Sequence, residues 1–366
     1  MNPPPILGGE EVDMIITRTP LRISFFGGGT DYPAWYRENG GAVLTTSIDK
    51  YCYINCRHQP PFFESRYRIA YRNIELCMNR DEIKHPSVRA CLSDMNIREG
   101  VEIVYAGDLP ARSGLGSSSS FTVGLVNALY ALQGKMISKG DLAKKAIHIE
   151  QNVIGEPVGS QDQIIAAHGG LKLISFNNDI IVQPVVLSPA RLELLQNHLM
   201  LFYTGTSRYG AVIAQDKIEN MPRRQGELRR IHELVYEALE VLTSGSNISE
   251  FGGLLQESWL LKRSLSEKVS TPGIDGLYDI ALASGAIGGK LLGAGGGGFL
   301  LFFVPQERRK HLKTALQSLL HVPFSFEHDG SKVILFDNSK NTVSDIEDDF
   351  ELPSQERWAA VAGKAL

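Results

Sequence analysis

The chain has 366 residues, of which 43% are hydrophobic and 21% charged, and its formal net charge is −4. This length exceeds what one core usually serves, so we expect two domains in an ordinary globular protein. The mildly acidic balance gives no overall attraction to nucleic acid or anionic membranes, and no apolar run could span a bilayer. The cysteines form no C-x-x-C pair, which favours reduced thiols in a cytoplasmic protein; they are Cys52, Cys56, Cys77 and Cys91.

The N-terminal part contains a glycine-rich loop behind a predicted strand. Residues 1–13 are rich in Pro and Gly and are acidic, which predicts a flexible leader. A predicted strand over 15–26, broken by Pro20, runs into the sequence GGGTDY at 27–32. Three glycines let the backbone approach a ligand closely, although a plain tight turn explains them as well.

An arginine lies on this predicted strand. Arg22 is two residues from Ser24 and four from Phe26, so the three share one face of the strand. An arginine that points toward a glycine loop is either a solvated edge charge or an anion contact, and both interpretations stay open from these residues alone.

The most informative stretch is residues 108–120, DLPARSGLGSSSS, which lies between a predicted strand at 101–105 and a predicted helix. The helix has one apolar stripe made of Phe121, Leu125, Leu129 and Leu132. Glycines permit close approach to a ligand, and a helix start offers unpaired N–H groups to phosphate. A capped glycine turn explains one Gly and one Ser but does not need Gly114, Gly116 and four serines. We therefore predict a phosphate-binding loop.

Two common nucleotide fingerprints are excluded. The pattern G-x-x-x-x-G-K-[ST] does not occur, because Gly289-Lys290 is followed by Leu291. A G-x-G-x-x-G match at 293–298 runs into the predicted strand 299–304, whereas a dinucleotide-binding fold needs a helix there. The chain is therefore neither a P-loop NTPase nor a Rossmann enzyme.

Two acidic residues follow the predicted phosphate loop. A helix that begins at Ser138 carries Leu142, Ala146 and Glu150 along one apolar stripe. A carboxylate on that face is costly unless it is paired or bound to metal, so we favour such a role over a residue at the edge of the stripe. Asp162 ends the next loop, where a helix N-cap is a strong alternative to a functional role.

The second half predicts further strands and long helices. A strand pair is predicted at 169–176 and 180–187, strands at 198–203 and 332–336, and helices at 209–243, 248–267, 274–287 and 306–321. The glycines at 293–298 predict a hairpin. We divide the chain into residues 14–190 and 191–337 as the two domains, and residues 338–366 as an acidic tail.

Three glycine-rich motifs together resemble the GHMP kinases, the family of galactokinase, homoserine kinase, mevalonate kinase and phosphomevalonate kinase. They are RTPLRI…GGGTDY at 18–32, PARSGLGSS at 110–118 and KLLGAGGGG at 290–298. The resemblance implies a two-domain α+β fold, with a ribosomal S5-like N-terminal domain and a ferredoxin-like C-terminal domain. It also implies that ATP and a small molecule bind between the domains of a monomer or homodimer.

The resemblance assigns roles by position. The ATP phosphates would lie against Pro110, Ser113, Gly114, Leu115, Gly116, Ser117, Ser118 and Ser119. Mg²⁺ would be held by Glu150 and Ser118, with Ser117 as the alternative serine. Asp162 would be the catalytic aspartate and Arg22 its cationic partner. The substrate would contact Gly28, Gly29, Thr30, Asp31, Gly295, Gly296 and Arg208, with Arg66, Arg68, Arg72 and Lys172 as weaker candidates for a substrate phosphate.

The departures from the family pattern narrow the choice of substrate. Galactokinases carry Glu and His where this chain has Gly28-Gly29, so galactose is disfavoured. The GGGTDY variant, with IDKY at 48–51 and TGTSR at 204–208, is similar to kinases that phosphorylate the anomeric hydroxyl of a heptose 7-phosphate. Such a reaction gives a 1,7-bisphosphate on the way to GDP-heptose for bacterial surface polysaccharide. The alternatives are a fucokinase- or galactokinase-like enzyme and a catalytically inactive ligand sensor.

Overall fold

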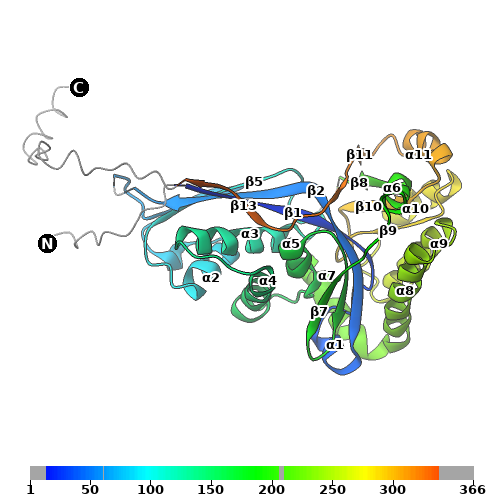
Figure 1. Cartoon of the computed structure of the whole chain (residues 1–366), viewed down its shortest axis with the longest axis horizontal. Helices are drawn as coiled ribbons and strands as arrows, with labels where there is room; N and C mark the ends of the chain where they lie inside the picture. Colours follow the sequence, from blue (N-terminus) through cyan, green and yellow to red (C-terminus); the bar gives the residue numbers. More distant parts are fainter. Residues whose placement is uncertain (1–13, 61, 206–209, 338–366) are drawn as a thin grey trace, which may run out of the picture.

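The structure is a computed structural model, and it describes residues 14–60, 62–205 and 210–337. Two sheets organise these residues, and each carries its own helices (Figure 1). The prediction of an α+β architecture is therefore confirmed. Within the described residues, no helix combines the length and apolar character that crossing a membrane requires.

The first sheet has nine strands and contains most of the N-terminal half. Its main path is β13 (Lys332–Asp337), β1 (Met14–Phe26), β2 (Gly41–His58), β5 (Val101–Gly107), β3 (Tyr67–Ala70) and β4 (Ile74–Cys77). Strands β6 (Leu171–Phe176) and β12 (Phe326–Glu327) also pair with β2, and β7 (Ile180–Pro184) pairs with β6. Beneath this sheet lie α2 (Pro86–Asp94), α3 (Ser117–Leu132), α4 (Lys139–His148) and α5 (Gln161–His168). Helix α1 (Pro33–Asn39) precedes β2.

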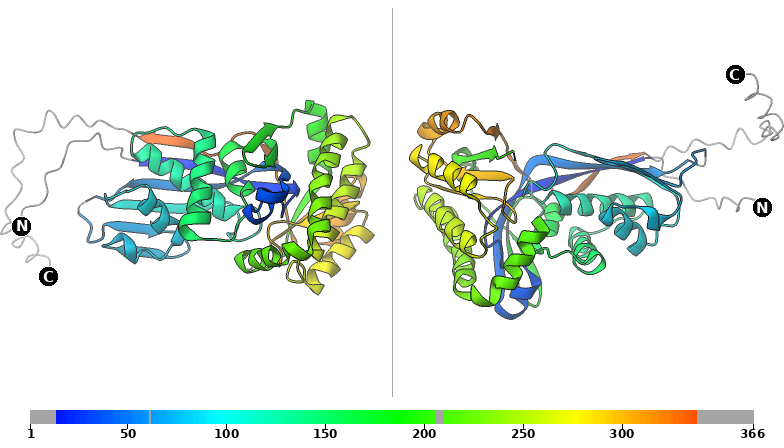
Figure 2. Two further views of the ribbon diagram at one scale, coloured as in Figure 1. Left: turned by 90° about the horizontal axis from the view of Figure 1, so that it is seen from below. Right: turned by 180° about the vertical axis from the view of Figure 1, so that it is seen from behind.

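The second sheet has four strands in the order β11 (Leu320–Val322), β8 (Leu199–Tyr203), β10 (Phe299–Phe303) and β9 (Gly288–Leu291). The C-terminal half of the chain, which contains this sheet, also has the helices α6 (Pro189–His198), α7 (Gly210–Asn220), α8 (Gln225–Thr243), α9 (Ser249–Ser264), α10 (Pro272–Ala283) and α11 (Arg309–Ala315). Short turns of 3₁₀ helix lie at Arg80–Glu82, Met221–Arg223 and Gln306–Arg308. Figure 2 shows the two halves side by side.

Two strands differ from their predicted lengths. Strand β1 continues through Pro20, because a register shift between Pro20 and Leu21 accommodates the missing N–H. The alternation of residues 51–57 predicts a strand there, but β2 already begins at Gly41, ten residues earlier. Its early part contains buried polar residues such as Thr45, whose hydroxyl donates to the carbonyl oxygen of Ile23 at 3.0 Å, and these hide the alternation of a strand.

The C-terminal strand returns to the N-terminal sheet. Residues 332–336 are predicted to belong to the second domain, but β13 pairs antiparallel with β1, from Lys332 opposite Arg18 to Asp337 opposite Met14. That part of the domain prediction is wrong, because the pairing partner lies more than 300 residues away in sequence, where local patterns carry no information. The strand closes the first sheet.

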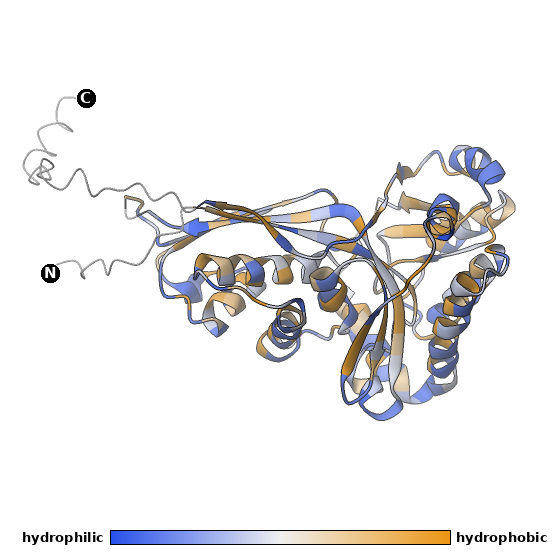
Figure 3. Cartoon of the chain, viewed as in Figure 1, coloured by the Kyte–Doolittle hydropathy of each residue, from blue (hydrophilic) through white to orange (hydrophobic). Residues whose placement is uncertain are grey.

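The two halves share apolar core. One cluster fills the space between the first sheet and its helices, including the predicted stripe of α3, which is buried as expected. A second cluster joins Ile23 and Phe25 of β1 to Phe251 of α9 and Phe299 of β10. Phe251 packs edge-to-face on Phe25, with ring centroids 5.5 Å apart. In Figure 3, apolar colour follows the strands and the helix sides turned toward them.

Candidate active site

The predicted phosphate loop connects β5 to the start of α3. Gly114 and Gly116 both have left-handed φ, at 88° and 74°, and Gly116 is the N-cap of the helix. The helix begins at Ser117, so its first N–H groups have no partner within the helix. These groups and the positive end of the helix dipole are the features that a phosphate site at a helix start uses, and phosphate binding at this loop stays a prediction.

The third glycine motif packs directly against this loop. A Cβ at Gly114 would lie 2.7 Å from the carbonyl oxygen of Leu292, and one at Gly293 would lie 2.4 Å from Gly114 Cα. A Cβ at Gly298 would lie 2.1 Å from the carbonyl oxygen of Ser113. No side chain fits between the two loops, so glycines are required on both sides of the contact.

Two glycines of the third motif, Gly295 and Gly296, are predicted substrate contacts. In the structure the N–H of Gly296 donates to the carbonyl oxygen of Val269 at 2.9 Å, and a Cβ at Gly295 would lie 2.7 Å from the same oxygen. The pair therefore holds the loop after α9. A direct contact with the substrate stays a prediction.

The four serines at the start of α3 differ in their contacts. The hydroxyl of Ser117 accepts from the N–H of Arg112 at 3.1 Å, and that of Ser120 donates to the carbonyl oxygen of Pro20 at 2.9 Å. Ser119 donates to Glu150 Oε2 at 2.8 Å. Ser118 is exposed on the first helical turn, which leaves its side chain available to a ligand.

Glu150 lies in a short π-helical turn, Ile149–Ile154, that follows α4. Its side chain is buried, and Gln163 joins Ser119 as a donor to Oε2. Among the described residues, Oε1 has no hydrogen-bond partner. Burial raises the pKa of Glu150 to about 7, and the donors offset part of that effect. The prediction that this carboxylate belongs to a buried network is confirmed.

The residues around Glu150 fit a magnesium ion in part. A buried carboxylate oxygen without a partner, beside serine hydroxyls, is a donor set that Mg²⁺ prefers. The described residues contain no group of three or more His, Cys, Asp or Glu side chains that could hold a metal. The remaining ligands would therefore be nucleotide phosphates and water.

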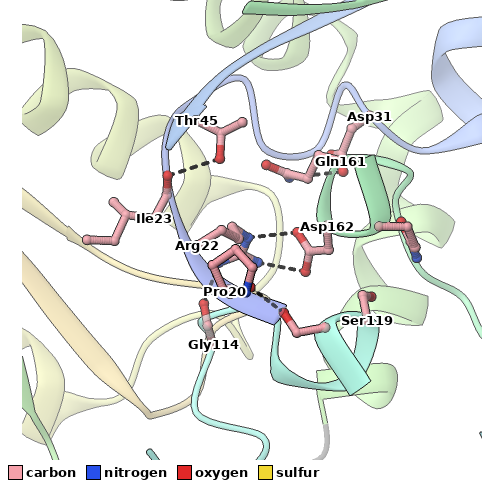
Figure 4. A network of polar contacts seen from close by, with 12 residues as sticks. Pro20, Arg22, Ile23, Asp31, Thr45, Gly114, Ser119, Gln161 and Asp162 are labelled. Atoms are coloured by element: carbon pink, nitrogen blue, oxygen red, sulfur yellow. Dashed lines mark hydrogen bonds and ion pairs between the residues drawn. The ribbon is translucent and has the colours of Figure 1, made fainter. Parts of the chain in front are cut away.

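Arg22 and Asp162 form a bidentate ion pair (Figure 4). Arg22 Nε donates to Asp162 Oδ1 at 2.7 Å and Nη2 donates to Oδ2 at 2.8 Å. Nη1 donates to the carbonyl oxygen of Gly114 at 2.7 Å, so the same guanidinium fixes the phosphate loop. The interpretation of Arg22 as a solvated edge charge is therefore wrong, because the side chain is buried. Asp162 is the second residue of α5 and Ser160 is its N-cap, so the N-cap reading of Asp162 is wrong as well.

Asp31 is a second buried carboxylate beside this pair. Its Oδ1 accepts from the N–H of Gly29 and its Oδ2 from Nε2 of Gln161, each at 2.9 Å. A Cβ at Gly159 would lie 1.9 Å from Oδ2, so that glycine makes room for the carboxylate. Burial raises the pKa of Asp31, and the two hydrogen bonds oppose this. The neighbouring Thr30 is fully buried and donates its hydroxyl to the carbonyl oxygens of Gly27 and Ala42, which supports the loop.

Three buried lysines near these residues are not predicted from the sequence. Lys290 Nζ donates to the carbonyl oxygen of Phe25 at 2.6 Å, and Lys262 Nζ donates to those of Leu291 and Gly293 at 2.6 and 2.7 Å. Lys217 of α7 lies over the ring of Tyr32, with Nζ 5.6 Å from the centroid. The sequence does contain a sign that Lys217 is buried. It lies four residues after Ile213 and four before Met221, so it is a charged residue on an apolar helical stripe.

The four candidates for a substrate phosphate that the structure describes form no hydrogen bond or ion pair with Arg22, Asp31 or Asp162. Arg208 lies outside the described residues. Arg66 donates to the carbonyl oxygen of Arg98 and Arg68 pairs with Glu102 of β5, while Arg72 is exposed in the turn between β3 and β4. Lys172 is on β6, opposite Thr45 of β2. Their role in binding a phosphate stays a prediction.

Two family models match the chain. The model of the GHMP kinases N terminal domain matches residues 83–170, which include the phosphate loop, Glu150 and Asp162. The model of the GHMP kinases C terminal domain matches residues 231–322, which include the third glycine motif.

Known proteins are similar over most of the chain. A D-glycero-alpha-D-manno-heptose 7-phosphate kinase from Campylobacter jejuni is 28% identical over 87% of this chain and 98% of its own length. A bifunctional fucokinase/GDP-fucose pyrophosphorylase from Arabidopsis thaliana is 25% identical over 81% of this chain, which spans 30% of that longer protein. The solved structure of a D-glycero-D-manno-heptose 1-phosphate kinase from Bacteroides thetaiotaomicron superposes with a TM-score of 0.72 at 23% identity, covering 88% of this chain and 99% of that chain. At that identity the likeness establishes the fold alone.

Proposed function

Because this chain belongs to the GHMP kinase family, we propose that it transfers the γ-phosphoryl group of ATP to the anomeric hydroxyl of D-glycero-α-D-manno-heptose 7-phosphate. The chain is an ATP-dependent sugar kinase, which follows from its family and its relatives. What we propose beyond this activity is the identity of the sugar, the hydroxyl that is phosphorylated and the roles of the residues.

One observation carries the residue roles. Asp162 lies directly beside the phosphate loop, since a Cβ at Gly116 would be 3.3 Å from Asp162 Oδ2 and 3.1 Å from Arg22 Cγ. A carboxylate at that distance from a helix start that binds phosphate is close to where an acceptor hydroxyl must attack. Phosphoryl transfer depends mainly on positioning and on stabilising charge, and this arrangement supplies both.

Each part of the site would have its own role in phosphoryl transfer. The N–H groups at the start of α3 would bind the phosphates, and Asp162 would hold the acceptor hydroxyl in line and take its proton. Arg22 would orient Asp162 and offset charge that develops on the transferred group. Ser118 and Glu150 would hold Mg²⁺, whose chemistry when bound is to neutralise phosphate charge. Asp31 would accept hydrogen bonds from sugar hydroxyls.

The choice of a heptose phosphate has two supports. The relative with that name aligns over nearly its whole length. In addition, a Cβ at Gly28 would make only ordinary contacts, 3.8 Å from Gln161 Nε2 and 3.9 Å from Ser24 Oγ, so the glycine omits a side chain that galactokinases carry at a position where one could be accommodated. The product would be a 1,7-bisphosphate, a precursor of GDP-heptose for surface polysaccharide.

A substrate panel tests the proposal. Purified full-length protein with ATP and Mg²⁺ is assayed against the heptose 7-phosphate, the free heptose, mannose, galactose, fucose and mevalonate, and products are assigned by phosphorus NMR. We expect transfer to the anomeric oxygen of the heptose 7-phosphate with the highest kcat/KM. A preference for fucose would favour a fucokinase-like enzyme, as the second relative suggests. ATP binding without transfer to any sugar would favour a ligand sensor.

A further inference from the structure

Lys217 is a buried cation without a hydrogen-bond partner. It is 5% exposed, and its ammonium forms no hydrogen bond or ion pair with another described residue. Its recorded contact is the face of Tyr32. Burying an ammonium group without acceptors is costly, so an unfilled donor at this depth indicates a ligand that supplies them.

The two other buried lysines provide an internal comparison. Lys262 and Lys290 are as deeply buried as Lys217, but both donate to backbone carbonyl oxygens: Lys262 to those of Leu291 and Gly293 in the third glycine motif, and Lys290 to that of Phe25 on β1. Those two ammonium groups therefore have a structural explanation within the chain. Lys217 has no such backbone acceptor, although its side chain is equally buried.

The charges around Lys217 indicate what kind of ligand it meets. Its charge interacts favourably with Asp31 and Asp162, the two carboxylates of the site. A phosphate dianion placed between these carboxylates would be repelled by both of them. A neutral hydroxyl oxygen accepts from the ammonium without that repulsion, and its proton can be donated to Asp31.

Two further unpaired polar atoms lie next to Asp31. Ser24 Oγ and Gln161 Oε1 are buried and lack hydrogen-bond partners among the described residues. They flank Gly28, whose Cβ would be 3.9 Å from Ser24 Oγ and 3.8 Å from Gln161 Nε2. A set of unpaired donors and acceptors around one buried carboxylate matches a polyhydroxylated ligand, in which each hydroxyl both donates and accepts.

We propose that Lys217 is a sugar-binding residue whose ammonium donates hydrogen bonds to ring hydroxyl oxygens that Asp31 also holds. The inference rests on the proposed function, and it adds a specificity determinant that the C-terminal half contributes to a sugar site made mainly of residues from the N-terminal half. The contact discriminates between sugars, and it leaves the ATP site unaffected.

The test compares Lys217→Met, which keeps the length and removes the donors, with Lys217→Arg and Lys217→Gln, which keep donors. The matched control is Lys268→Met, a lysine that is exposed and pairs with Asp216 next to Lys217. Thermal unfolding verifies that each variant is folded. Substrates are the heptose 7-phosphate and its 2-deoxy, 3-deoxy and 4-deoxy analogues, with KM for sugar and for ATP measured separately.

A charged hydrogen bond to a substrate hydroxyl changes binding by about 10- to 100-fold. We therefore expect Lys217→Met to raise the sugar KM by about that factor with the ATP KM unchanged. Wild type should discriminate against one deoxy analogue, and Lys217→Met should lose that discrimination. Arg or Gln should restore part of it, and the control should behave as wild type.

A Lys217→Met enzyme that keeps wild-type discrimination at all three positions overturns the inference, because a purely structural lysine would reduce activity on every analogue equally. If wild type rejects the heptose but accepts another sugar of the panel, the proposed substrate is wrong, and the same ratios are measured with that sugar. A wild-type protein that neither binds nor phosphorylates any sugar overturns both.

Discussion

Asp162 is oriented by two guanidinium nitrogens on one side and faces the phosphate loop on the other. Asp162→Asn keeps the shape of the side chain and removes the proton acceptor. We expect kcat to fall by a factor on the order of 10²–10⁴, with little change in the ATP KM. Steady-state kinetics with the preferred sugar measures this.

The control for that substitution is Asp141→Asn, at an exposed acidic residue that receives a hydrogen bond from the N-cap Ser138 of α4. It should leave kcat unchanged. An Asp162→Asn enzyme that is folded and turns over at nearly the wild-type rate would show that Asp162 is not the base.

Lys217 also sets an expected pH dependence. Burial lowers the pKa of Lys217 to about 8, and Asp31 and Asp162 oppose the shift. The ammonium is therefore present below pH 8 and is lost above it, so kcat/KM for the sugar should fall as the pH rises through about 8. The charged and titratable groups near it are Asp31, Tyr32, Asp162, Arg22, Lys262 and Lys290.

Lys217→Arg separates Lys217 from these neighbours, because a guanidinium stays protonated throughout the range. Its kcat/KM should be flat where that of wild type declines. An unchanged decline in Lys217→Arg would assign the titration to another group, such as Lys290, whose pKa burial lowers to about 7.

Individual residues could be predicted to different degrees. Glu150 and Lys217 give the same local signal, a charge on an apolar helical stripe, but only Glu150 coincided with a position that the family resemblance marks. The contacts of the serines could not be predicted. Which of Ser118 and Ser119 meets Glu150 depends on where the first helical turn begins, and adjacent serines are equivalent in the sequence.

At the level of elements, the phosphate loop depends on its contact with the third glycine motif. Gly114→Ala would put a Cβ at a φ of 88° and 2.7 Å from the carbonyl oxygen of Leu292. We expect a loss of about 1–3 kcal/mol in the free energy of unfolding and a raised ATP KM, because the loop must move. Denaturant unfolding and ATP kinetics measure the two effects.

Gly134→Ala is the matched control for this loop. Gly134 also has a positive φ, 66°, but a Cβ there meets nothing within 4 Å. Gly134→Ala therefore strains the backbone but creates no steric clash. We expect it to lower the free energy of unfolding and to leave the ATP KM unchanged. Equal effects of both substitutions on ATP binding would mean that the packing of the two loops does not shape the phosphate site.

Elements with a strong repeat were predicted well, and those with local irregularities were not. The strand–loop–helix at 101–132 and the hairpin at 288–303 lie where the patterns placed them. Helical spacing continues the stripe of Leu142, Ala146 and Glu150 to Val153, but the π-helical turn Ile149–Ile154 shifts the phase of the helix and leaves Val153 exposed. Extra backbone residues of this kind leave no sign in the order of apolar residues.

For the whole molecule, the core shared by both halves predicts cooperative unfolding. Phe251 is fully buried between Phe25 of β1 and Phe303 of β10. Phe251→Ala should lower the free energy of unfolding by about 3–5 kcal/mol while calorimetry still shows one transition. The control Phe62→Ala removes the same atoms from a side chain that is 93% exposed, and should have little effect. Two separate transitions in the Phe251 variant would contradict a shared core.

The overall architecture followed from the sequence only where neighbours in the chain are neighbours in space. The pairing of β13 with β1, and the contact between the two glycine motifs, join segments separated by 170 residues or more. Hydrophobic periodicity is a property of each segment alone, so it does not identify which distant segment that segment contacts. The expectation that ATP and substrate bind between the halves came from the family resemblance and not from residue patterns.

The packing of Gly293 and Gly298 on the phosphate loop also orders events during synthesis. A ribosome releases the loop at 113–116 long before it releases the glycines that hold it in shape. A nascent chain that ends before Gly293 therefore lacks the contact that shapes this loop, so the loop can reach its final form only after most of the chain has been made.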